Sequence, residues 1–385
     1  MKKICVVVGS RANYSSIKSL MREVKAHPNL ELQLIVCASA VLEKYGKVVD
    51  QIELDGFSCD FKLNFIIEGE TPITMAKSTG LGITEIANVL EVLNPNFVVT
   101  VGDRYETMAT TIAATYMNIP LAHTMGGEVT GTIDESIRHA TTKFAHLHFT
   151  ASEDATRRVI RMGEIKENVH WVGCPRIDLV KEILDIKSDI IDLEKKVNSY
   201  GIGSNINLTE KFLLLSFHPV TTEFGNNFNN ISEIFKAIEK LGLQTIILWP
   251  NSDAGSSEIS KFYRIFREKN INSPFHFVKN LPIDVYVKLM DLTCCLVGNS
   301  SSGIREGAFI GTPVVNIGSR QNLRESGENV ITVEPESSLI FEAIKIQINK
   351  IKYNSNNIYG DGNAGFKIAE ILSKSDIKIQ KTITY

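Results

Sequence analysis

The stretch Gly298-Asn299-Ser300-Ser301-Ser302-Gly303-Ile304-Arg305-Glu306 follows a short apolar run at 293–297 and opens a segment with helical spacing. It predicts a strand, a Gly/Ser turn and a helix N-terminus. Unpaired backbone N–H groups at such an N-terminus, together with hydroxyls and a closely approaching glycine, make a cradle for an anion, most naturally a phosphate. Glu306, less than a turn further on, could reach two sugar hydroxyls. The serines could equally only cap the helix, so this segment alone leaves both interpretations open.

The same alternation of strand and helix extends through both halves of the chain. Apolar or β-branched runs lie at 4–8, 32–37, 97–101, 121–124 and 147–150, and again at 212–217, 244–248, 275–278, 294–297 and 314–317. Segments with helical spacing separate them, which is the βαβ pattern of a parallel, doubly wound sheet. We therefore expect an α/β protein with two Rossmann-like domains.

A charged helical stretch around 178–199 marks the junction between the two halves. A chain of 385 residues suits two domains, each large enough to bury its own core. The expected boundaries are 1–176 for the N-terminal domain, 177–204 for the connection and 205–362 for the C-terminal domain. A last helix, within about 363–385, has no strand after it.

Composition excludes several classes of protein. With 41 basic and 44 acidic residues the formal net charge is -3, so no positive field is available to hold a nucleic acid. The six cysteines show no Cys-x-x-Cys spacing and most lie in apolar runs, as expected of reduced core residues in a cytoplasmic protein. No apolar run approaches the roughly 20 residues of a membrane span, so a soluble protein is expected.

Polar residues that follow the strands are the candidates for chemistry, because ligands of such sheets bind beyond the strands' carboxyl ends. Arg11, after the first strand, could bind a diphosphate through two hydrogen bonds. Asp103 and Arg104 follow the run at 97–101, and Glu128 and Asp134 follow the run at 121–124. Each acidic residue could be an ordinary N-cap, but three carboxylates at one edge repel one another and are seldom gathered without a purpose.

Histidines give a second set of candidates. His218 follows a strand of the second half and could donate to a phosphate. His146 and His148 are two residues apart on one strand and so face the same side of the sheet. A zinc site would need a third ligand, and none has convincing spacing, so no metal is expected. A packed or hydrogen-bonded pair that supports the carboxylates is the simpler interpretation.

Six motifs in the chain resemble those of the hydrolysing UDP-N-acetylglucosamine 2-epimerases, and the resemblance covers nearly the whole chain. They are Gly-Ser-Arg-Ala-Asn-Tyr-Ser at 9–15, Gly-Asp-Arg-Tyr-Glu at 102–106, His-Thr-Met-Gly-Gly-Glu-Val-Thr-Gly-Thr-Ile-Asp-Glu-Ser-Ile-Arg-His at 123–139, Phe-His-Pro-Val-Thr at 217–221, Pro-Asn-Ser-Asp-Ala-Gly-Ser at 250–256 and the stretch at 298–306. The non-hydrolysing relatives have a His-x-Glu-Ala-Gly-Leu-Arg type of segment where this chain has Gly-Gly-Glu-Val-Thr-Gly, which favours the hydrolysing branch.

The resemblance implies a glycosyltransferase-B-like fold, with the nucleotide sugar in an interdomain cleft and the last helix returning to the N-terminal domain. It implies conversion of UDP-N-acetylglucosamine to N-acetylmannosamine and UDP, through elimination to a glycal and hydration, for sialic acid-type synthesis, without a cofactor. The implied acid/base residues are Asp103, Glu128 and Asp134, and which of them takes the proton stays open. The implied UDP-binding residues are Arg11, Ser15, Arg104, His218, Asn251, Ser300, Ser301, Glu306 and Arg320. His123, His146 and His148 match positions on the sugar side.

Alternatives remain at this stage. The same branch includes enzymes that act on UDP-2,4-diacetamido-2,4,6-trideoxyglucose in the legionaminic acid pathway. A glycosyltransferase of the same fold and a non-catalytic sensor of nucleotide sugars are the rivals from other classes. In each case the partner is a UDP-sugar, and the expected assembly is a homo-oligomer, either a dimer or a tetramer.

Overall fold

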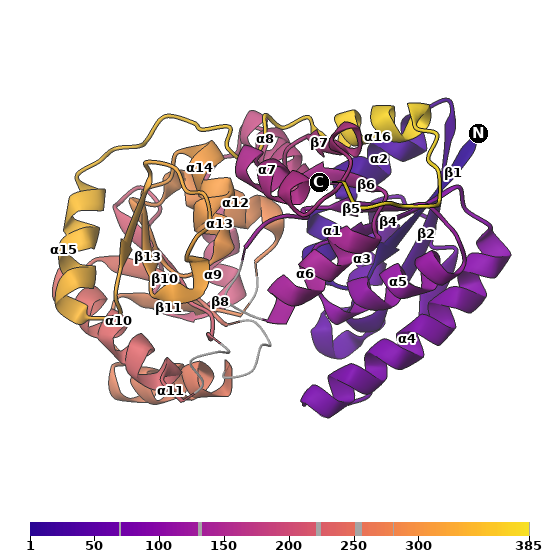
Figure 1. Ribbon diagram of the computed structural model, residues 1–385. Coiled ribbons are helices and arrows are strands. Elements are labelled where there is room, and N and C mark those ends of the chain that lie inside the picture. The colour runs from indigo at the N-terminus through magenta and orange to yellow at the C-terminus, as the bar shows by residue number, and fades with distance from the viewer. Residues whose placement is uncertain (69–70, 130–132, 221–224, 251–255, 280, 385) are drawn as a thin grey trace. The chain divides into compact units, whose positions relative to one another are not determined.

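The computed structural model describes residues 1–384 except 69–70, 130–132, 221–224, 251–255 and 280. The chain divides into two compact units (Figure 1). The first contains Met1–Glu128, Ile133–Leu179 and Gly360–Tyr385, and the second consists mainly of Val180–Tyr359. Each unit is built around one sheet of seven strands, with helices on both faces.

The sheet of the first unit is parallel throughout, in the order β3-β2-β1-β4-β5-β6-β7. Its strands are β1 (Lys2–Val8), β2 (Leu30–Cys37), β3 (Phe61–Leu63), β4 (Phe97–Val101), β5 (Leu121–Thr124), β6 (Leu147–Thr150) and β7 (Val169–Trp171). The apolar runs of β1 and β4 are buried on both faces, as expected for a sheet covered by helices on each side. The strand order reverses between β1 and β4, and the carboxyl ends of these two strands therefore form a switch point.

The helices of the first unit are distributed over both faces of its sheet. They are α1 (Arg11–Ser15), α2 (Lys18–Ala26), α3 (Val48–Leu54), α4 (Pro72–Leu93), α5 (Tyr105–Tyr116), α6 (Ile133–Phe144), α7 (Glu153–Arg161), the start of α8 (Pro175–Asp185) and α16 (Ala364–Lys374), with short 3-10 turns η1 (Ala38–Val41), η2 (Glu43–Tyr45) and η3 (Lys166–Asn168). Cys5 and Val7 of β1 join a core with α4 and α5. The final helix, α16, packs on α2 (Figure 1).

One carboxylate fixes α16 within the first unit. Asp178 accepts the backbone N–H groups of Ala364 and Gly365, at 2.9 and 2.7 Å, and the hydroxyl of Ser19 on α2, at 2.8 Å. A carboxylate at a helix N-terminus satisfies N–H groups that have no partner inside the helix. The last helix of the chain therefore belongs to the N-terminal sheet.

The sheet of the second unit has the order β14-β13-β12-β9-β10-β11-β8, in which β8 runs antiparallel to β11. Its strands are β8 (Gly201–Gly203), β9 (Phe212–Ser216), β10 (Gln244–Leu248), β11 (Phe275–Val278), β12 (Cys295–Gly298), β13 (Val314–Ile317) and β14 (Val330–Val333). The order reverses between β9 and β12, which gives this unit its own switch point.

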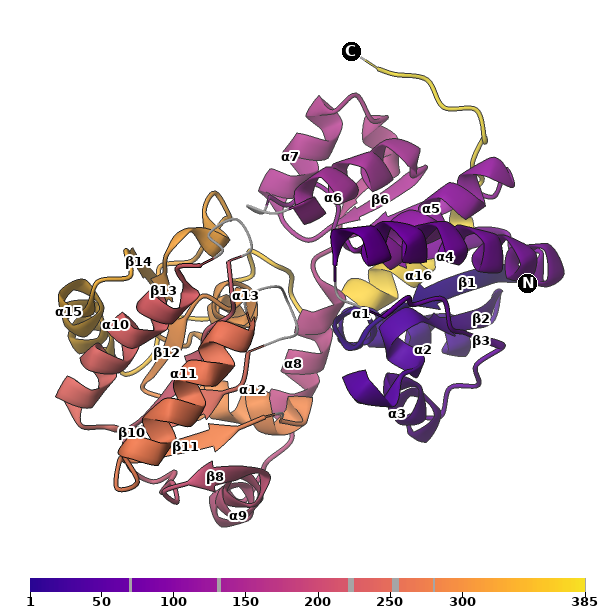
Figure 2. The same cartoon turned by 90° about the horizontal axis from the view of Figure 1, so that it is seen from below.

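The helices of the second unit also cover both faces of its sheet. They are α9 (Ile190–Tyr200), α10 (Asn227–Leu241), α11 (Ser256–Lys269), α12 (Ile283–Leu292), α13 (Ser301–Ile304), α14 (Glu306–Ile310) and α15 (Ser337–Ile348), with the 3-10 turn η5 (Ser319–Gln321). Helix α10 contacts both α11 and α15 (Figure 2). Leu193 and Val197 of α9 lie in the core of this unit, although the sequence places them in the stretch expected to connect the domains.

Candidate functional site

The Gly/Ser turn of the second unit depends on a glycine that no other residue can replace. Gly298, the last residue of β12, has φ +132°, and a Cβ there would lie 2.1 Å from the carbonyl oxygen of Ser216. After the turn, Ser300 caps α13, with its Oγ accepting from the N–H of Ser302 at 3.4 Å. The single helix expected after the turn is two short segments, α13 and α14, that meet at Arg305, whose ψ of -69° departs from regular helix geometry.

Asn299 joins the turns that follow β9 and β12. Its Oδ1 accepts from the N–H of His218 at 2.7 Å, and its Nδ2 donates to the carbonyl oxygen of the same residue at 2.8 Å. The carbonyl oxygen of Asn299 accepts from Nη1 of Arg320 at 3.2 Å and from Nε2 of Gln321 at 2.8 Å. Asn299 therefore holds together three of the expected nucleotide-binding elements: the serine turn, His218 and Arg320. No role for Asn299 was predicted from the sequence.

The surroundings of this turn keep the ring of His218 uncharged. Loss of hydration and the nearby guanidinium of Arg320 lower the pKa of His218 to about 3, so its ring is neutral at neutral pH and carries one N–H donor. Ser301 begins α13, and Glu306, which is 2% exposed, lies in the first turn of α14. Asn251, also expected here, lies outside the described residues.

In the first unit, two arginines lie near the turn after β1: Arg11 on α1 and Arg176 on α8. Ser10 caps α1, accepting from the N–H of Asn13 at 3.2 Å, and this places Arg11 and Ser15 beyond the carboxyl end of β1. Arg176 donates to Oγ of Ser15 at 2.6 Å. Partial loss of hydration and the positive charge of Arg176 lower the pKa of Arg11. Two neighbouring guanidinium groups favour an anionic ligand, and Arg176 is a residue that the sequence did not single out.

The turns after β1 and β4 meet through a buried carboxylate. Glu106, 2% exposed in the first turn of α5, accepts from Nε of Arg104 at 2.8 Å. A Cβ on Gly9 would lie 2.2 Å from Cγ of Glu106, so the turn after β1 needs a glycine to pass this side chain. Glu106 therefore fixes the orientation of the Arg104 side chain near the switch point of the first sheet.

A buried arginine links the turns that carry two of the three expected catalytic residues. Arg138, on α6, is 1% exposed; its Nη2 donates to Oδ2 of Asp103, after β4, and its Nη1 donates to the carbonyl oxygen of Glu128, after β5, at 2.9 Å. Asp134 lies four residues before Arg138 and so on the same side of α6. Arg138 therefore bonds to the carboxylate of Asp103 and to the backbone of Glu128, and Asp134 lies one turn before it on α6.

His123 stabilises the turn that carries Asp103. It lies on β5, fully buried, with Nε2 2.7 Å from the carbonyl oxygen of Gly102 and Nδ1 3.3 Å from Oγ1 of Thr142. Burial lowers the pKa of His123 to about 4, and the neutral ring donates its Nε2–H to Gly102. This bond fixes the turn that carries Asp103.

His146 and His148 make their hydrogen bonds elsewhere, which differs from the expectation that they support the carboxylates. His146 accepts from the N–H of Leu121 at 3.1 Å and lies 3.0 Å from the carbonyl oxygen of Ile379 in the C-terminal segment. Nε2 of His148 lies 3.0 Å from Oε2 of Glu164. The two histidines therefore help to attach the end of the chain to the sheet.

Glu164 is the centre of that second cluster. Its carboxylate accepts from Nζ of Lys143 and from Nζ of Lys381, both at 2.6 Å. Burial raises the pKa of Glu164, but the hydrogen bonds from His148, Lys143 and Lys381 outweigh it and lower the pKa to about 2. The cluster is an anchor for the C-terminal segment.

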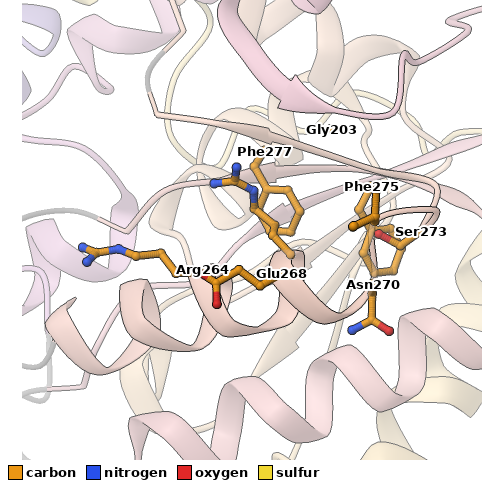
Figure 3. A pocket seen from close by; sticks show the side chains of 9 residues that line it. Gly203, Arg264, Glu268, Asn270, Ser273, Phe275 and Phe277 are labelled. Carbon is orange, nitrogen blue, oxygen red and sulfur yellow. The ribbon is translucent and has the colours of Figure 1, made fainter.

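Other candidate features lie apart from these turns. A hollow of about 300 Å³ in the second unit is lined by Arg267, Asn270, Ser273 and Phe275, near the amino end of β11 (Figure 3). It is at the opposite end of the sheet from His218 and Ser300.

Among the described residues, no group of three or more His, Cys, Asp or Glu side chains is arranged to hold a metal ion. None of the helices formed by these residues is both long and apolar enough to cross a bilayer.

Two doubly wound units of this kind define a glycosyltransferase-B-like α/β protein. The family model described as UDP-N-acetylglucosamine 2-epimerase matches residues 22–373. A UDP-N,N'-diacetylbacillosamine 2-epimerase (hydrolyzing) of Legionella pneumophila is 33% identical over 372 residues, covering 97% of this chain and 96% of the relative. A UDP-N-acetylglucosamine 2-epimerase of Neisseria meningitidis is 30% identical over 364 residues, covering 94% and 92%.

The fold is shared with solved structures. The crystal structure of UDP-GlcNAc 2-epimerase from Neisseria meningitidis bound to UDP-GlcNAc matches with a TM-score of 0.82 at 21% identity, covering 97% of this chain and 100% of that one. The Methanocaldococcus jannaschii enzyme in complex with UDP-GlcNAc and UDP matches with a TM-score of 0.79 at 21% identity, with the same coverage. The chain belongs to the UDP-N-acetylglucosamine 2-epimerase family, an enzyme family.

Proposed function

We propose that the protein is a hydrolysing 2-epimerase that converts UDP-N-acetylglucosamine to free N-acetylmannosamine and UDP. The observation that carries the proposal is the ion pair between Arg138 and Asp103, with the carbonyl of Glu128 bonded to the same guanidinium and Asp134 one turn away. Epimerisation at C2 needs acid/base groups on both faces of the ring. A buried cation that links carboxylate-bearing turns would hold such groups in fixed positions.

The reaction proceeds in two steps. A carboxylate takes the C2 proton, the C–H electrons form the C1–C2 double bond, and the C1–O bond breaks with UDP leaving on its electron pair. Water then adds at C1 of the glycal and a proton returns to the opposite face of C2. No electrons are gained or lost overall, so the proposal includes no cofactor. Asp103, Glu128 and Asp134 are the proposed acid/base residues.

The departing diphosphate carries the negative charge that the step develops, and cations stabilise it. The proposed phosphate ligands are Arg11, Ser15, Arg104, His218, Ser300 and Ser301, to which we add Arg176 because of its effect on Arg11. Glu306 would accept from the ribose hydroxyls, and Arg320 and Asn251 would lie near the nucleotide. The proposed nucleotide ligands thus come from both units, and the proposed acid/base residues come from the first.

The hydrolysing outcome rests on the segment Gly126-Gly127-Glu128 and on the Legionella pneumophila relative, whose name includes the hydrolysing activity. That relative also supports a second candidate substrate, a UDP-2,4-diacetamido-2,4,6-trideoxyhexose, because the match covers 97% of this chain. The two substrates differ at C4 and C6, remote from the C1–C2 bond, so the mechanism is the same for both.

Phosphorus NMR of the purified protein with each of the two UDP-sugars tests the proposal. A hydrolysing enzyme releases UDP, with its terminal β-phosphate signal, in proportion to the free sugar formed. A non-hydrolysing enzyme instead produces a second UDP-sugar and stops at equilibrium. Turnover that persists in Asp103→Asn, Glu128→Gln and Asp134→Asn variants would favour a glycosyltransferase, and absence of turnover with either sugar would contradict the proposal.

A further inference from the structure

The phenol of Tyr286 reaches the serine turn of the second unit from a helix that has no part in the proposed function. Tyr286 lies in the first turn of α12, and its ring packs against the apolar core of this unit. Helix α12 also contacts α14, which begins at Glu306 (Figure 1). The hydroxyl oxygen of Tyr286 lies 2.6 Å from Oγ of Ser302. A side chain from outside the turn is therefore hydrogen-bonded to it, in a position that core packing fixes.

Ser302 links Tyr286 to Ser300. The Oγ atoms of the two serines lie 2.8 Å apart, and Oγ of Ser300 also accepts from the backbone N–H of Ser302 at 3.4 Å. Ser302 is 5% exposed, whereas Ser300 is only partly buried. We call Tyr286, Ser302 and Ser300 the hydroxyl chain. It leads from the core of the unit to a residue proposed to bind phosphate.

The hydrogen bonds of the hydroxyl chain have a preferred direction. Loss of hydration raises the pKa of Tyr286 to about 12, although its hydrogen bond with Ser302 opposes this, so the phenol keeps its proton at neutral pH. A phenol is a stronger acid than an aliphatic alcohol, and Tyr286 is therefore the better donor in its contact with Ser302. Each hydroxyl has one proton to donate, so Ser302 then donates to Ser300.

This direction determines what Ser300 can offer to a ligand. Its oxygen has two lone pairs, and the N–H and the hydroxyl of Ser302 occupy both. The proton of Ser300 is then directed away from the hydroxyl chain, where it can be donated to an anion. If the direction were reversed, Ser300 would present a lone pair, which repels a phosphate oxygen. Successive hydrogen bonds that run one way also polarise one another and strengthen the last donor.

We propose that Tyr286 is a positioning residue for the nucleotide phosphate, because its hydroxyl acts through Ser302 to direct the proton of Ser300 toward the bound diphosphate. The inference rests on the proposed function, in which Ser300 is a ligand of the UDP moiety. Tyr286 itself makes no contact with the phosphate in this arrangement. Its effect should therefore depend on the presence of a phosphate in the ligand and of the hydroxyl of Ser300.

Titration calorimetry with UDP and ligand-observed NMR with uridine test the dependence on phosphate. Tyr286→Phe removes only the hydroxyl and is expected to weaken UDP binding by roughly 3- to 12-fold, as for the loss of one hydrogen bond, while uridine binds as to wild type. Tyr200→Phe, on α9 and 44% exposed in wild type, is the matched control and should bind both ligands normally.

Three results would count against the inference. Wild-type UDP affinity in Tyr286→Phe would overturn it and leave the proposed function intact. Equal losses of UDP and uridine affinity would show that the hydroxyl only maintains the shape of the unit, which would also overturn it. A wild-type protein that binds no UDP would contradict both the inference and the proposed function.

A double-mutant cycle tests the route through Ser300. In a Ser300→Ala protein the hydroxyl chain no longer reaches the phosphate, so adding Tyr286→Phe should cause no further loss of UDP affinity. Ser301→Ala is the matched comparison: the hydroxyl chain does not pass through Ser301, so its loss and that of Tyr286→Phe should add. Thermal unfolding of each variant verifies that it is folded. Additive losses in the Tyr286→Phe, Ser300→Ala double variant would overturn the proposed route.

Discussion

The guanidinium of Arg138, buried on α6, is ion-paired with the carboxylate of Asp103 on the turn that follows β4. The same guanidinium bonds to the backbone of Glu128, on the turn that follows β5. A buried arginine is stable only when its charge and its donors are matched, so α6 and these two turns determine one another's positions. Arg138 is thus a positioning residue for the proposed acid/base groups.

Replacing Arg138 should impair both stability and turnover. We expect Arg138→Met to lower the free energy of unfolding by about 2–4 kcal/mol, less than for a fully buried pair because Asp103 is 25% exposed. Displacement of Asp103 should lower kcat by roughly 10²-fold. Arg138→Lys should recover part of the stability but little of the kcat, since one ammonium cannot reproduce the forked geometry. Denaturant titration and UDP release measure the two effects. Arg157→Met, on the exposed face of α7, is the control and should change neither.

The three carboxylates should affect the chemical step rather than nucleotide binding. We expect Asp103→Asn, Glu128→Gln and Asp134→Asn each to lower kcat by roughly 10²–10⁴, because an amide cannot accept or return the C2 proton. The affinity for UDP, measured by calorimetry, should stay within a few-fold of wild type. An amide variant that loses UDP binding while remaining folded would place that residue with the nucleotide.

Glu306 should show the opposite pattern. If it accepts from two ribose hydroxyls in both the ground and the transition state, Glu306→Ala should weaken UDP binding by roughly 1.5–3 kcal/mol and affect KM more than kcat. Because Glu306 is 2% exposed, thermal unfolding of the variant must accompany the calorimetry. Normal UDP affinity in a stable Glu306→Ala protein would exclude the ribose assignment.

The buried neutral His123 predicts a loss of stability in acid. In the unfolded chain its pKa is about 6.5, and in the folded protein it is about 4. Between these values the unfolded state binds a proton that the folded state does not, so stability falls as pH decreases through this window. His123→Gln should remove about 3 kcal/mol of the loss seen between pH 7 and pH 4, from about 1.4 kcal/mol per pKa unit. Equal pH dependence of wild type and His123→Gln would refute the assignment.

The doubly wound fold could be predicted from the sequence because its long strands are uninterrupted apolar runs. Residues 4–8, for example, lie within β1 and are buried on both faces. The three-residue strands β3, β7 and β8 were missed, since so few residues show no periodicity. The break between α13 and α14 at Arg305 was also missed, because no proline marks it in the sequence.

The site residues, too, could be predicted only in part from the sequence. Asp103, Glu128 and Asp134 stand out as acidic residues beyond strands, and the motifs point to them. Arg138 lies inside the quoted motif at 123–139 but received no role, because nothing local reveals that its side chain crosses to Asp103, 35 residues away in sequence. The hydrogen-bond partners of His146 and His148 could not be predicted for a related reason: they include Ile379 and Glu164, which only the folded chain brings near.

The proposed reaction breaks the C1–O bond of a UDP-2-acetamido sugar by elimination, with proton exchange at C2. A proton NMR time course in deuterated water, with UDP-N-acetylglucosamine and the UDP-2,4-diacetamido sugar in separate samples, tests it most directly. We expect at least one of them to yield UDP and the free 2-epimer, with deuterium at C2 of the first product formed. Protium at C2 of that product, or a 2-epimer that remains attached to UDP, would contradict it.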